Sequence, residues 1–281
     1  AKYGIASVLA GVVSHTGSDS RYFNREGRYA DGGAYRDPNS PYRSWYDFDP
    51  KYKGGYRSWW GFETLPEVNE ENPSYVEFIT GEGGVIDTWL RRGAAGFRLD
   101  VADVLPDDFI EKIRAAVKRV SPEKFLLGEV WEDATTKYGF GQRRTYLLGK
   151  GLDSVMNYPF KNAVLDFVKG KPAEQAMGEI LSICEHYPAP AMDTALNFLS
   201  THDTERALTV IADEPANGRG REWQSGRNVS GEAYEEGMLR LRMAYAIIYT
   251  LPGLPCLYYG DEIGMQGYRD PFNRGYYCWD S

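Results

Sequence analysis

Cysteine and histidine are scarce in this sequence, and their scarcity limits the chemistry open to it. Of 281 residues, three are cysteine and three are histidine. The cysteines, Cys184, Cys256 and Cys278, are odd in number and scattered along the chain. They therefore form neither a disulfide framework nor a metal-ligand cluster. We expect no metal site and no cofactor.

Long apolar runs and an excess of positive charge are also missing. The longest apolar run, residues 243–251, is too short to span a bilayer and is expected to be a buried helix. Asp and Glu outnumber Lys and Arg by 40 to 32, which gives a formal net charge of −8. This balance argues against nucleic acid or an anionic membrane as the main partner. No Gly-rich phosphate loop follows the first predicted strand, which argues against a nucleotide-binding function.

Strand and helix patterns alternate along most of the chain. Short apolar segments predict six strands, at about 5–14, 95–100, 125–130, 153–156, 195–200 and 255–260. Helices are expected between them, over 72–92, 106–121, 157–169, 172–186 and 233–251. Such alternation predicts an α/β protein with a parallel sheet covered by helices. In a closed barrel or an open sheet alike, ligands gather at the carboxyl ends of the strands.

The stretch from residue 16 to about 64 follows neither the helical nor the strand period. It is rich in Gly, Pro, Asp, Arg and aromatic residues. A long segment of this kind inside a compact domain is usually a functional excursion. We predict that residues 16–64 form an inserted aromatic-rich subdomain, and that 1–15 and 65–281 form the catalytic domain. Its own core would come from Tyr42, Trp45, Tyr46, Tyr52, Tyr56, Trp59 and Trp60.

Three carboxylates, Asp100, Glu129 and Asp203, follow predicted buried strands. Arg98 lies two residues before Asp100 and shares its face of the strand, so it would keep that carboxylate ionised. Glu129 lies in apolar company beside Trp131, and burial favours the protonated form that a general acid needs.

Splitting an acetal between sugars needs one carboxylate to attack and one acid to protonate the leaving oxygen. A further negative group stabilises the cationic transition state. Taken singly, each of the three acids is more often structural, and an isolated Arg-x-Asp is more often an ion pair. Two of the histidines, His15 and His202, also lie at strand ends, whereas His186 is expected only to end a helix.

Three segments resemble signature segments of the α-amylase superfamily, glycoside hydrolase family thirteen. They are residues 96–100 (GFRLD), 128–131 (GEVW) and 198–203 (FLSTHD). Residues 65–69 (LPEVN) and 264–271 (GMQGYRDP) are similar to the neopullulanase, cyclomaltodextrinase and amylopullulanase branch. The resemblance covers nearly all of the chain.

This resemblance implies a role for each candidate residue. Asp100 would be the nucleophile, Glu129 the acid/base and Asp203 the stabiliser of the transition state. Arg98 would orient Asp100, while His15, His202 and Trp131 would contact the sugar. The implied reaction is retaining hydrolysis of α-glucosidic bonds in starch-like glucans, maltooligosaccharides, pullulan or cyclodextrins.

The first strand departs from the family's pattern. The family's Asp-x-Val-x-Asn-His segment is replaced by residues 10–15 (AGVVSH), so Ala10 stands for Asp and Ser14 for Asn. Without that Asp, Arg98 would be a poorly paired buried charge. Relatives often bind calcium, but the Asn expected at position 14 is absent, and we expect no metal here.

The family's first segment lies on the third of eight barrel strands. We therefore expect a truncated chain that forms an incomplete or rearranged (β/α) barrel of TIM type with six parallel strands. Two sheet edges would then be exposed. A second copy in a homo-oligomer, another chain, or a smaller barrel would have to cover them. Two alternatives to an active enzyme stay open: a truncated or engineered scaffold with weak or no activity, and a non-enzymatic sugar-binding module.

Overall fold

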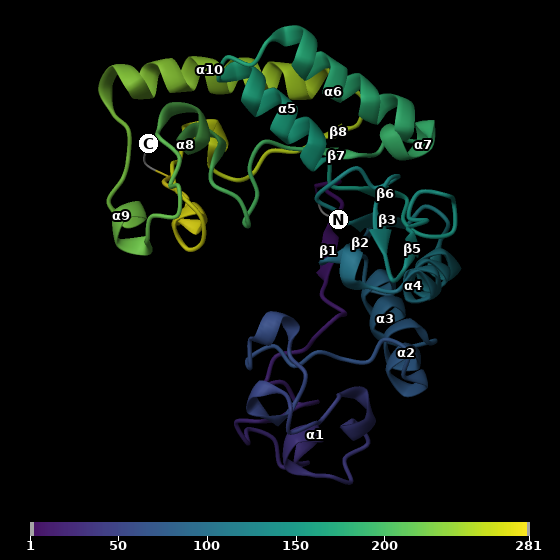
Figure 1. The fold of residues 1–281 in the computed structure, drawn as a ribbon. Helices are drawn as coiled ribbons and strands as arrows, with labels where there is room; N and C mark the ends of the chain where they lie inside the picture. Colours follow the sequence, from purple (N-terminus) through teal and green to yellow (C-terminus); the bar gives the residue numbers. More distant parts are fainter. Residues whose placement is uncertain (1–2, 280–281) are drawn as a thin grey trace. The chain divides into compact units, whose positions relative to one another are not determined.

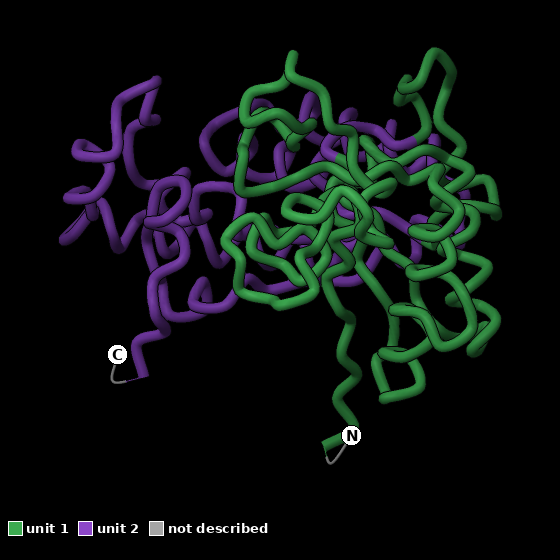
Figure 2. Tube along the Cα trace, turned by 90° about the horizontal axis from the view of Figure 1, so that it is seen from below, with its two compact units in different colours: residues 1–130, 135–153 green, residues 131–134, 154–281 purple. Residues whose placement is uncertain are grey.

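The computed structural model describes residues 3–279 and divides the chain into two compact units (Figures 1 and 2). The first unit contains residues 1–130 and 135–153, and the second contains 131–134 and 154–281. Each unit has its own strands, helices and hydrophobic core, and the two are described in turn.

Parallel strands in consecutive order form the sheet of the first unit (Figure 1). They are β1 (Val8–Gly11), β2 (Gly96–Leu99) and β3 (Phe125–Gly128). Arg98 in β2 is in register with Ala10 of β1 and with Leu127 of β3. Phe97 and Leu99 are buried, as their alternation predicts. The three predicted strands are confirmed, with shorter bounds.

The helix predicted over residues 72–92 is two helices, α2 (Pro73–Thr80) and α3 (Val85–Arg91). Asn72 caps the first, because its side chain accepts hydrogen bonds from two backbone N–H groups of the first turn. The prediction of one helix is wrong because the backbone turns between them. Gly83 has φ 74°, a left-handed conformation that few side chains tolerate. The helix α4 (Asp107–Val120) agrees with its prediction.

The helices of the aromatic segment 16–64 are short turns, among them α1 (Gly33–Arg36), and isolated β-bridges join residues 46 and 58 to residues 68 and 66. Trp45, Tyr46 and Tyr56 are buried and supply the predicted aromatic core. Phe23, which the sequence did not single out, is fully buried and lies 4.7 Å from Tyr56 between ring centroids. Trp60, predicted to belong to this core, is instead 79% exposed. A small hairpin of β4 (Tyr138–Gly139) and β5 (Gln142–Arg143) completes the strands described in this unit.

The second unit contains short parallel strand pairings and several helices (Figure 1). Its strands are β6 (Ser154–Val155), β7 (Leu196–Asn197) and β8 (Leu254–Pro255). β7 pairs with β8, and a parallel bridge joins Met156 to Leu196. Its helices are α5 (Tyr158–Val168), α6 (Ala173–His186), α7 (Ala189–Met192), α8 (Ala207–Ala212), α9 (Arg221–Ser225) and α10 (Gly231–Thr250). The last strand is two residues long and begins one residue earlier than the predicted 255–260.

Among residues 3–279, none of the helices has the length and apolar character required to cross a membrane.

The second unit contains a buried ion pair. Arg206 has no exposed surface and its Nη1 lies 3.1 Å from Asp261 Oδ1. The same nitrogen donates to the carbonyl of Tyr259, and the Tyr245 hydroxyl donates to Asp261. Burial raises the pKa of Asp261, against the opposing effect of these hydrogen bonds. Removal of either side chain would therefore leave the other as an unpaired buried charge.

We predict that Arg206→Met lowers the free energy of unfolding by about 3–5 kcal/mol, because Asp261 is left as a buried charge without a cation. Urea denaturation followed by tryptophan fluorescence measures this loss. The double variant Arg206→Met, Asp261→Leu should lose less than the single variant, since it buries no unpaired charge. An equal or larger loss in the double variant would contradict the prediction.

Candidate active site

Arg98 and Asp100 lie at the carboxyl end of β2. Arg98 Nη1 is 2.5 Å from Asp100 Oδ1, and their side chains are 13% and 22% exposed. Strand alternation places both on the same face, as the sequence predicts. The guanidinium therefore holds the carboxylate in a partly buried, charge-assisted contact.

Glu129 follows β3 and faces the same guanidinium. Its Oε2 lies 3.1 Å from Arg98 Nη2, and its side chain is 4% exposed. The same oxygen accepts a hydrogen bond of 2.7 Å from the backbone N–H of Val101. Val101 has φ 40°, a left-handed conformation that is rare for a β-branched residue. One cation thus holds two carboxylates from neighbouring strands.

His15 lies beyond the end of β1 in the same unit. A hydrogen bond of 2.9 Å joins the Ser14 hydroxyl to His15 Nδ1. Burial lowers the pKa of His15, and the nearby negative charge of Asp100 partly opposes this effect. Ser14, which departs from the family's pattern, therefore orients the imidazole ring.

His202, Asp203 and Trp131 belong to the second unit. His202 Nε2 lies 3.0 Å from Asp203 Oδ2, and Arg274 lies 3.4 Å from the other carboxylate oxygen. Trp131 stacks on Tyr158 with ring centroids 4.2 Å apart and is 42% exposed.

The structure thus brings Arg98, Asp100 and Glu129 together. His15 is close enough to Asp100 for the negative charge of that residue to affect its pKa. It brings His202 together with Asp203 in the other unit. That Asp203 acts beside the first two carboxylates stays a prediction.

Asn273 supports the His202–Asp203 segment and was not found from the sequence. It is fully buried, and its Nδ2 donates to the carbonyls of His202 at 2.7 Å and Thr204 at 2.8 Å. It fixes the backbone on both sides of Asp203. It lies two residues after the segment 264–271, whose similarity to one branch of the family was the available signal.

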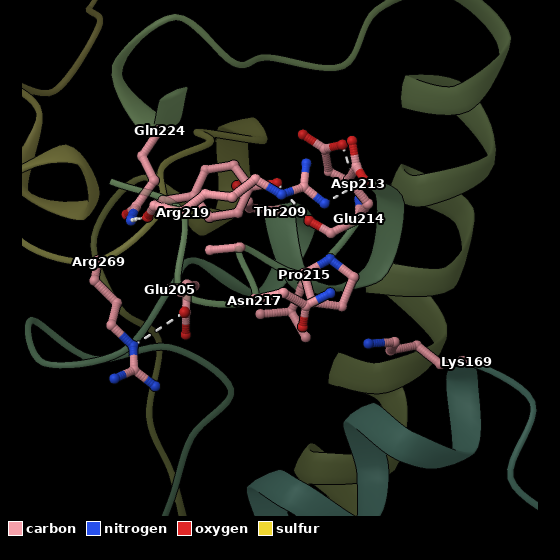
Figure 3. Close-up of a pocket in the computed structure, with 14 residues that line it drawn as sticks. Lys169, Glu205, Thr209, Asp213, Glu214, Pro215, Asn217, Arg219, Gln224 and Arg269 are labelled. Carbon is pink, nitrogen blue, oxygen red and sulfur yellow. Dashed lines mark hydrogen bonds and ion pairs between the residues drawn. The ribbon is translucent and has the colours of Figure 1, made fainter. Parts of the chain in front are cut away.

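A polar cavity of about 480 Å³ lies in the second unit, close in sequence to Asp203 (Figure 3). Arg269 and Glu205 form one of its walls and pair at 3.0 Å. Asp213 and Glu214 lie on another, where Arg219 pairs with Glu214 at 2.8 Å. Asp213 pairs with Arg227 at 2.6 Å, so each of these three carboxylates has a cationic partner.

Among residues 3–279, no group of three or more His, Cys, Asp or Glu side chains is arranged to hold a metal ion. Ser14 stands where relatives of the family carry Asn, and its hydroxyl is bonded to His15. No step below uses a metal.

The family model "Alpha amylase, catalytic domain" matches residues 1–279. An amylopullulanase of Thermoanaerobacter thermohydrosulfuricus is 36% identical over 314 aligned residues, covering 98% of this chain and 20% of that protein. A cyclomaltodextrinase of a Bacillus species is 34% identical over 226 residues, covering 78% of this chain and 34% of that protein.

Among solved structures, the cyclic α-maltosyl-(1→6)-maltose hydrolase of Arthrobacter globiformis superimposes with a TM-score of 0.79 at 27% identity. This match covers 99% of the chain and 55% of that protein. That hydrolase has been solved with its cyclic maltosyl-maltose and with maltose.

The chain belongs to the α-amylase family of glycosidases, and the matched part is the family's catalytic domain. Its α/β fold with a parallel sheet matches the TIM-barrel catalytic domain of that family. The chain spans about a fifth of the amylopullulanase and about a third of the cyclomaltodextrinase that it matches.

We predict that Arg98→Gln lowers the free energy of unfolding by about 3–5 kcal/mol, because the buried Glu129 loses its cation. The free energy of unfolding of Arg98→Lys should lie between those of Arg98→Gln and the parent, since an ammonium group cannot span two carboxylates as the planar guanidinium does. Urea denaturation measures both. The control Arg28→Gln removes an exposed pair with Asp19 and should cost less than about 1 kcal/mol. Similar losses for Arg98→Gln and this control would refute the assignment.

Glu70 gives the first unit a pH-dependent stability. Burial raises its pKa to about 7, with further contributions from the charges of Glu67 and Glu71, while Arg57 opposes the shift. The folded state therefore binds a proton more tightly than the unfolded chain, whose carboxyl titrates near 4.5. This stabilisation is present below pH 4.5 and is lost as the pH rises through about 7.

We predict that Glu70→Gln is more stable than the parent at pH 8 and close to it at pH 5. Urea denaturation at the two pH values measures the difference. Glu123→Gln is the matched control: Glu123 is exposed, belongs to the same unit and does not contribute to the pKa of Glu70, so the stability of this variant should equal that of the parent at both pH values. A parent protein whose stability does not fall between pH 5 and pH 8 relative to Glu70→Gln would show the prediction to be wrong.

Proposed function

We propose that this chain carries the catalytic core of a retaining glycoside hydrolase. Its substrates would be α-glucosidic bonds in starch-like glucans, maltooligosaccharides, pullulan or cyclodextrins. The observation that carries the proposal is the pair of carboxylates, Asp100 and Glu129, held on one guanidinium at the ends of neighbouring strands. The names of the amylopullulanase and cyclomaltodextrinase relatives support the substrate class.

The reaction would proceed in two displacements. In the first, an oxygen of Asp100 attacks the anomeric carbon while Glu129 donates its proton to the glycosidic oxygen. The bond to the leaving sugar breaks, and a glycosyl ester on Asp100 forms. In the second, Glu129 takes a proton from water, whose oxygen attacks the anomeric carbon and releases Asp100. Asp203 would stabilise the positive charge of both transition states.

The environment of each residue suits its proposed role. Arg98 pairs with Asp100 Oδ1 and orients the carboxylate, as a nucleophile requires. Glu129 is almost fully buried, and its Oε2 accepts a hydrogen bond from the Val101 N–H, which fixes the orientation of the carboxyl group. His15 and His202 would donate hydrogen bonds to the sugar in the cleavage subsite, and Trp131 would supply an aromatic face.

The finer architecture is part of the proposal. Six parallel strands would form an incomplete or rearranged TIM-type barrel from 1–15 and 65–281, with 16–64 as its inserted subdomain. β1 is the terminal strand in the order of its sheet, and Val8 within it and Val12 directly after it are 45% and 46% exposed. An unpaired edge with apolar side chains is a site where a second copy or another chain would pair.

We predict that the parent releases reducing sugar from maltooligosaccharides and pullulan, and that Asp100→Asn and Glu129→Gln lose more than about thousandfold of this activity. Each variant removes one half of the acid-and-nucleophile pair. The matched control is Asp103→Asn, which lies three residues from the nucleophile and pairs with Lys137 at 3.3 Å. This control should keep the activity of the parent. Equal rates for the parent and Asp100→Asn would contradict the proposal that this chain is a glycoside hydrolase.

One observation favours the second candidate, a scaffold with weak or no activity. Ala10 is in register with Arg98, at the position where the family carries an acid. Arg98 faces Asp100 and Glu129, with no carboxylate from β1. Ala10→Asp should then raise the turnover of a weak parent, because it would give Arg98 another partner and loosen its hold on Glu129. A fully active parent that Ala10→Asp leaves unchanged would remove this candidate.

A further inference from the structure

A stack of aromatic rings extends outward from His15 in the first unit. The ring centroids of His15 and Trp59 are 5.3 Å apart, with planes tilted by 31°. Those of Trp59 and Trp60 are 4.9 Å apart and nearly parallel, at 11°. Trp60, at the outer end, is 79% exposed. The imidazole is therefore continuous with an indole face that is open to solvent.

Backbone pairing fixes the stack in place. Residues 58 and 66 form an antiparallel bridge, and so do residues 15 and 67. The backbone N–H of Trp59 also donates to the carbonyl of Leu65 at 2.9 Å. The segment 65–67 thus joins the loop that carries the tryptophans to the segment that carries His15. The ring of Trp60 is held at a set distance from the histidine.

The conformation of Trp60 is unfavourable for its residue type. Its φ of 51° and ψ of 24° are in the left-handed region, which costs a bulky residue about 1–3 kcal/mol. An indole that is mostly exposed recovers none of this by burial in a core. The indole N–H of Trp59 is buried and has no acceptor among the described residues. Neither feature is explained by packing of the aromatic segment.

A sugar ring is the ligand that these features fit. The apolar C–H face of a glucose residue packs on an indole face, and its rim of hydroxyl groups stays in water. The adjacent exposed side chain of Phe62, at 55%, extends the apolar surface. Trp59 separates Trp60 from His15, and the glucose residues of an α-glucan are linked in one chain, so a chain longer than the cleavage site contacts both His15 and Trp60.

We propose that Trp60, supported by Trp59, is an aromatic platform for a glucose residue of the α-glucan, outside the one contacted by His15. This inference rests on the proposed function, and it makes Trp60 a determinant of the preference for longer chains. A disaccharide confined to the cleavage site would not reach the platform. A heptasaccharide would.

The test compares maltoheptaose and maltotriose as substrates of the parent and of Trp60→Ala. We expect the variant to raise the KM for maltoheptaose about tenfold with kcat unchanged, because it removes one stacked ring. The KM for maltotriose should change less than twofold. Trp60→Phe should stay close to the parent. An unchanged KM for maltoheptaose in Trp60→Ala overturns the inference while the parent's hydrolysis upholds the proposed function.

Binding of maltoheptaose, measured by calorimetry, distinguishes a failure of the platform inference from a failure of the proposed function. If the parent binds the heptasaccharide without hydrolysing it, and Trp60→Ala weakens binding about tenfold, the inference about Trp60 is supported and the proposed hydrolase activity is contradicted. A parent that neither binds nor hydrolyses overturns both. Trp89→Ala is the matched control: it is an exposed tryptophan of the same unit, 46% exposed on α3, and should leave binding unchanged. Circular dichroism melting should show Trp60→Ala as stable as the parent, since its ring packs little.

Discussion

The contact on which the first unit depends is that of Arg98 with two carboxylates. Asp100 and Glu129 end neighbouring parallel strands, so the sheet itself brings two negative charges to one edge. In a partly buried setting their repulsion is poorly screened, and a cation between them is needed. The register between β2 and β3 sets which residues meet, because Arg98 lies opposite Leu127, two residues before Glu129. A slip of one residue would turn these side chains to the other face.

Much of this could be predicted, because it depends on short-range patterns. Alternation in residues 96–100 gave the strand and placed Arg98 with Asp100, and the structure has both. α4, with its apolar face, also agreed with its prediction. Helix α2 and its Asn72 cap were predicted too, but the helix was extended through Gly81–Gly84, where the backbone turns. The pattern of apolar residues continues across that turn, so periodicity could not show it.

What could not be predicted depends on contacts between distant residues. Glu129 was identified, but its contact with Arg98 depends on strand register, which the sequence leaves open. Asn273 holds the His202 segment across about seventy positions, and nothing in its local sequence marks that contact. The aromatic segment shows the limit clearly. Composition predicts that its rings cluster, yet it does not distinguish Tyr56, which is buried, from Trp60, which is exposed.

Backbone strain separates the parts of the first unit that only fold from those proposed to act. Among the described residues, five other than glycine have positive φ: Asn24, Trp60, Val101, Phe140 and Asn217. Asparagine adopts this conformation at little cost, and Phe140 precedes Gly141 in the tight turn between β4 and β5, where such angles are favoured. Trp60 and Val101 are bulky or β-branched residues, and neither lies in a hairpin turn, so their positive φ values are not explained by residue type or by turn geometry. Val101 turns its N–H toward Glu129, and Trp60 extends the stack that starts at His15. The two costly conformations therefore both serve residues of the proposed site, which is the pattern expected when strain is retained for function rather than for stability.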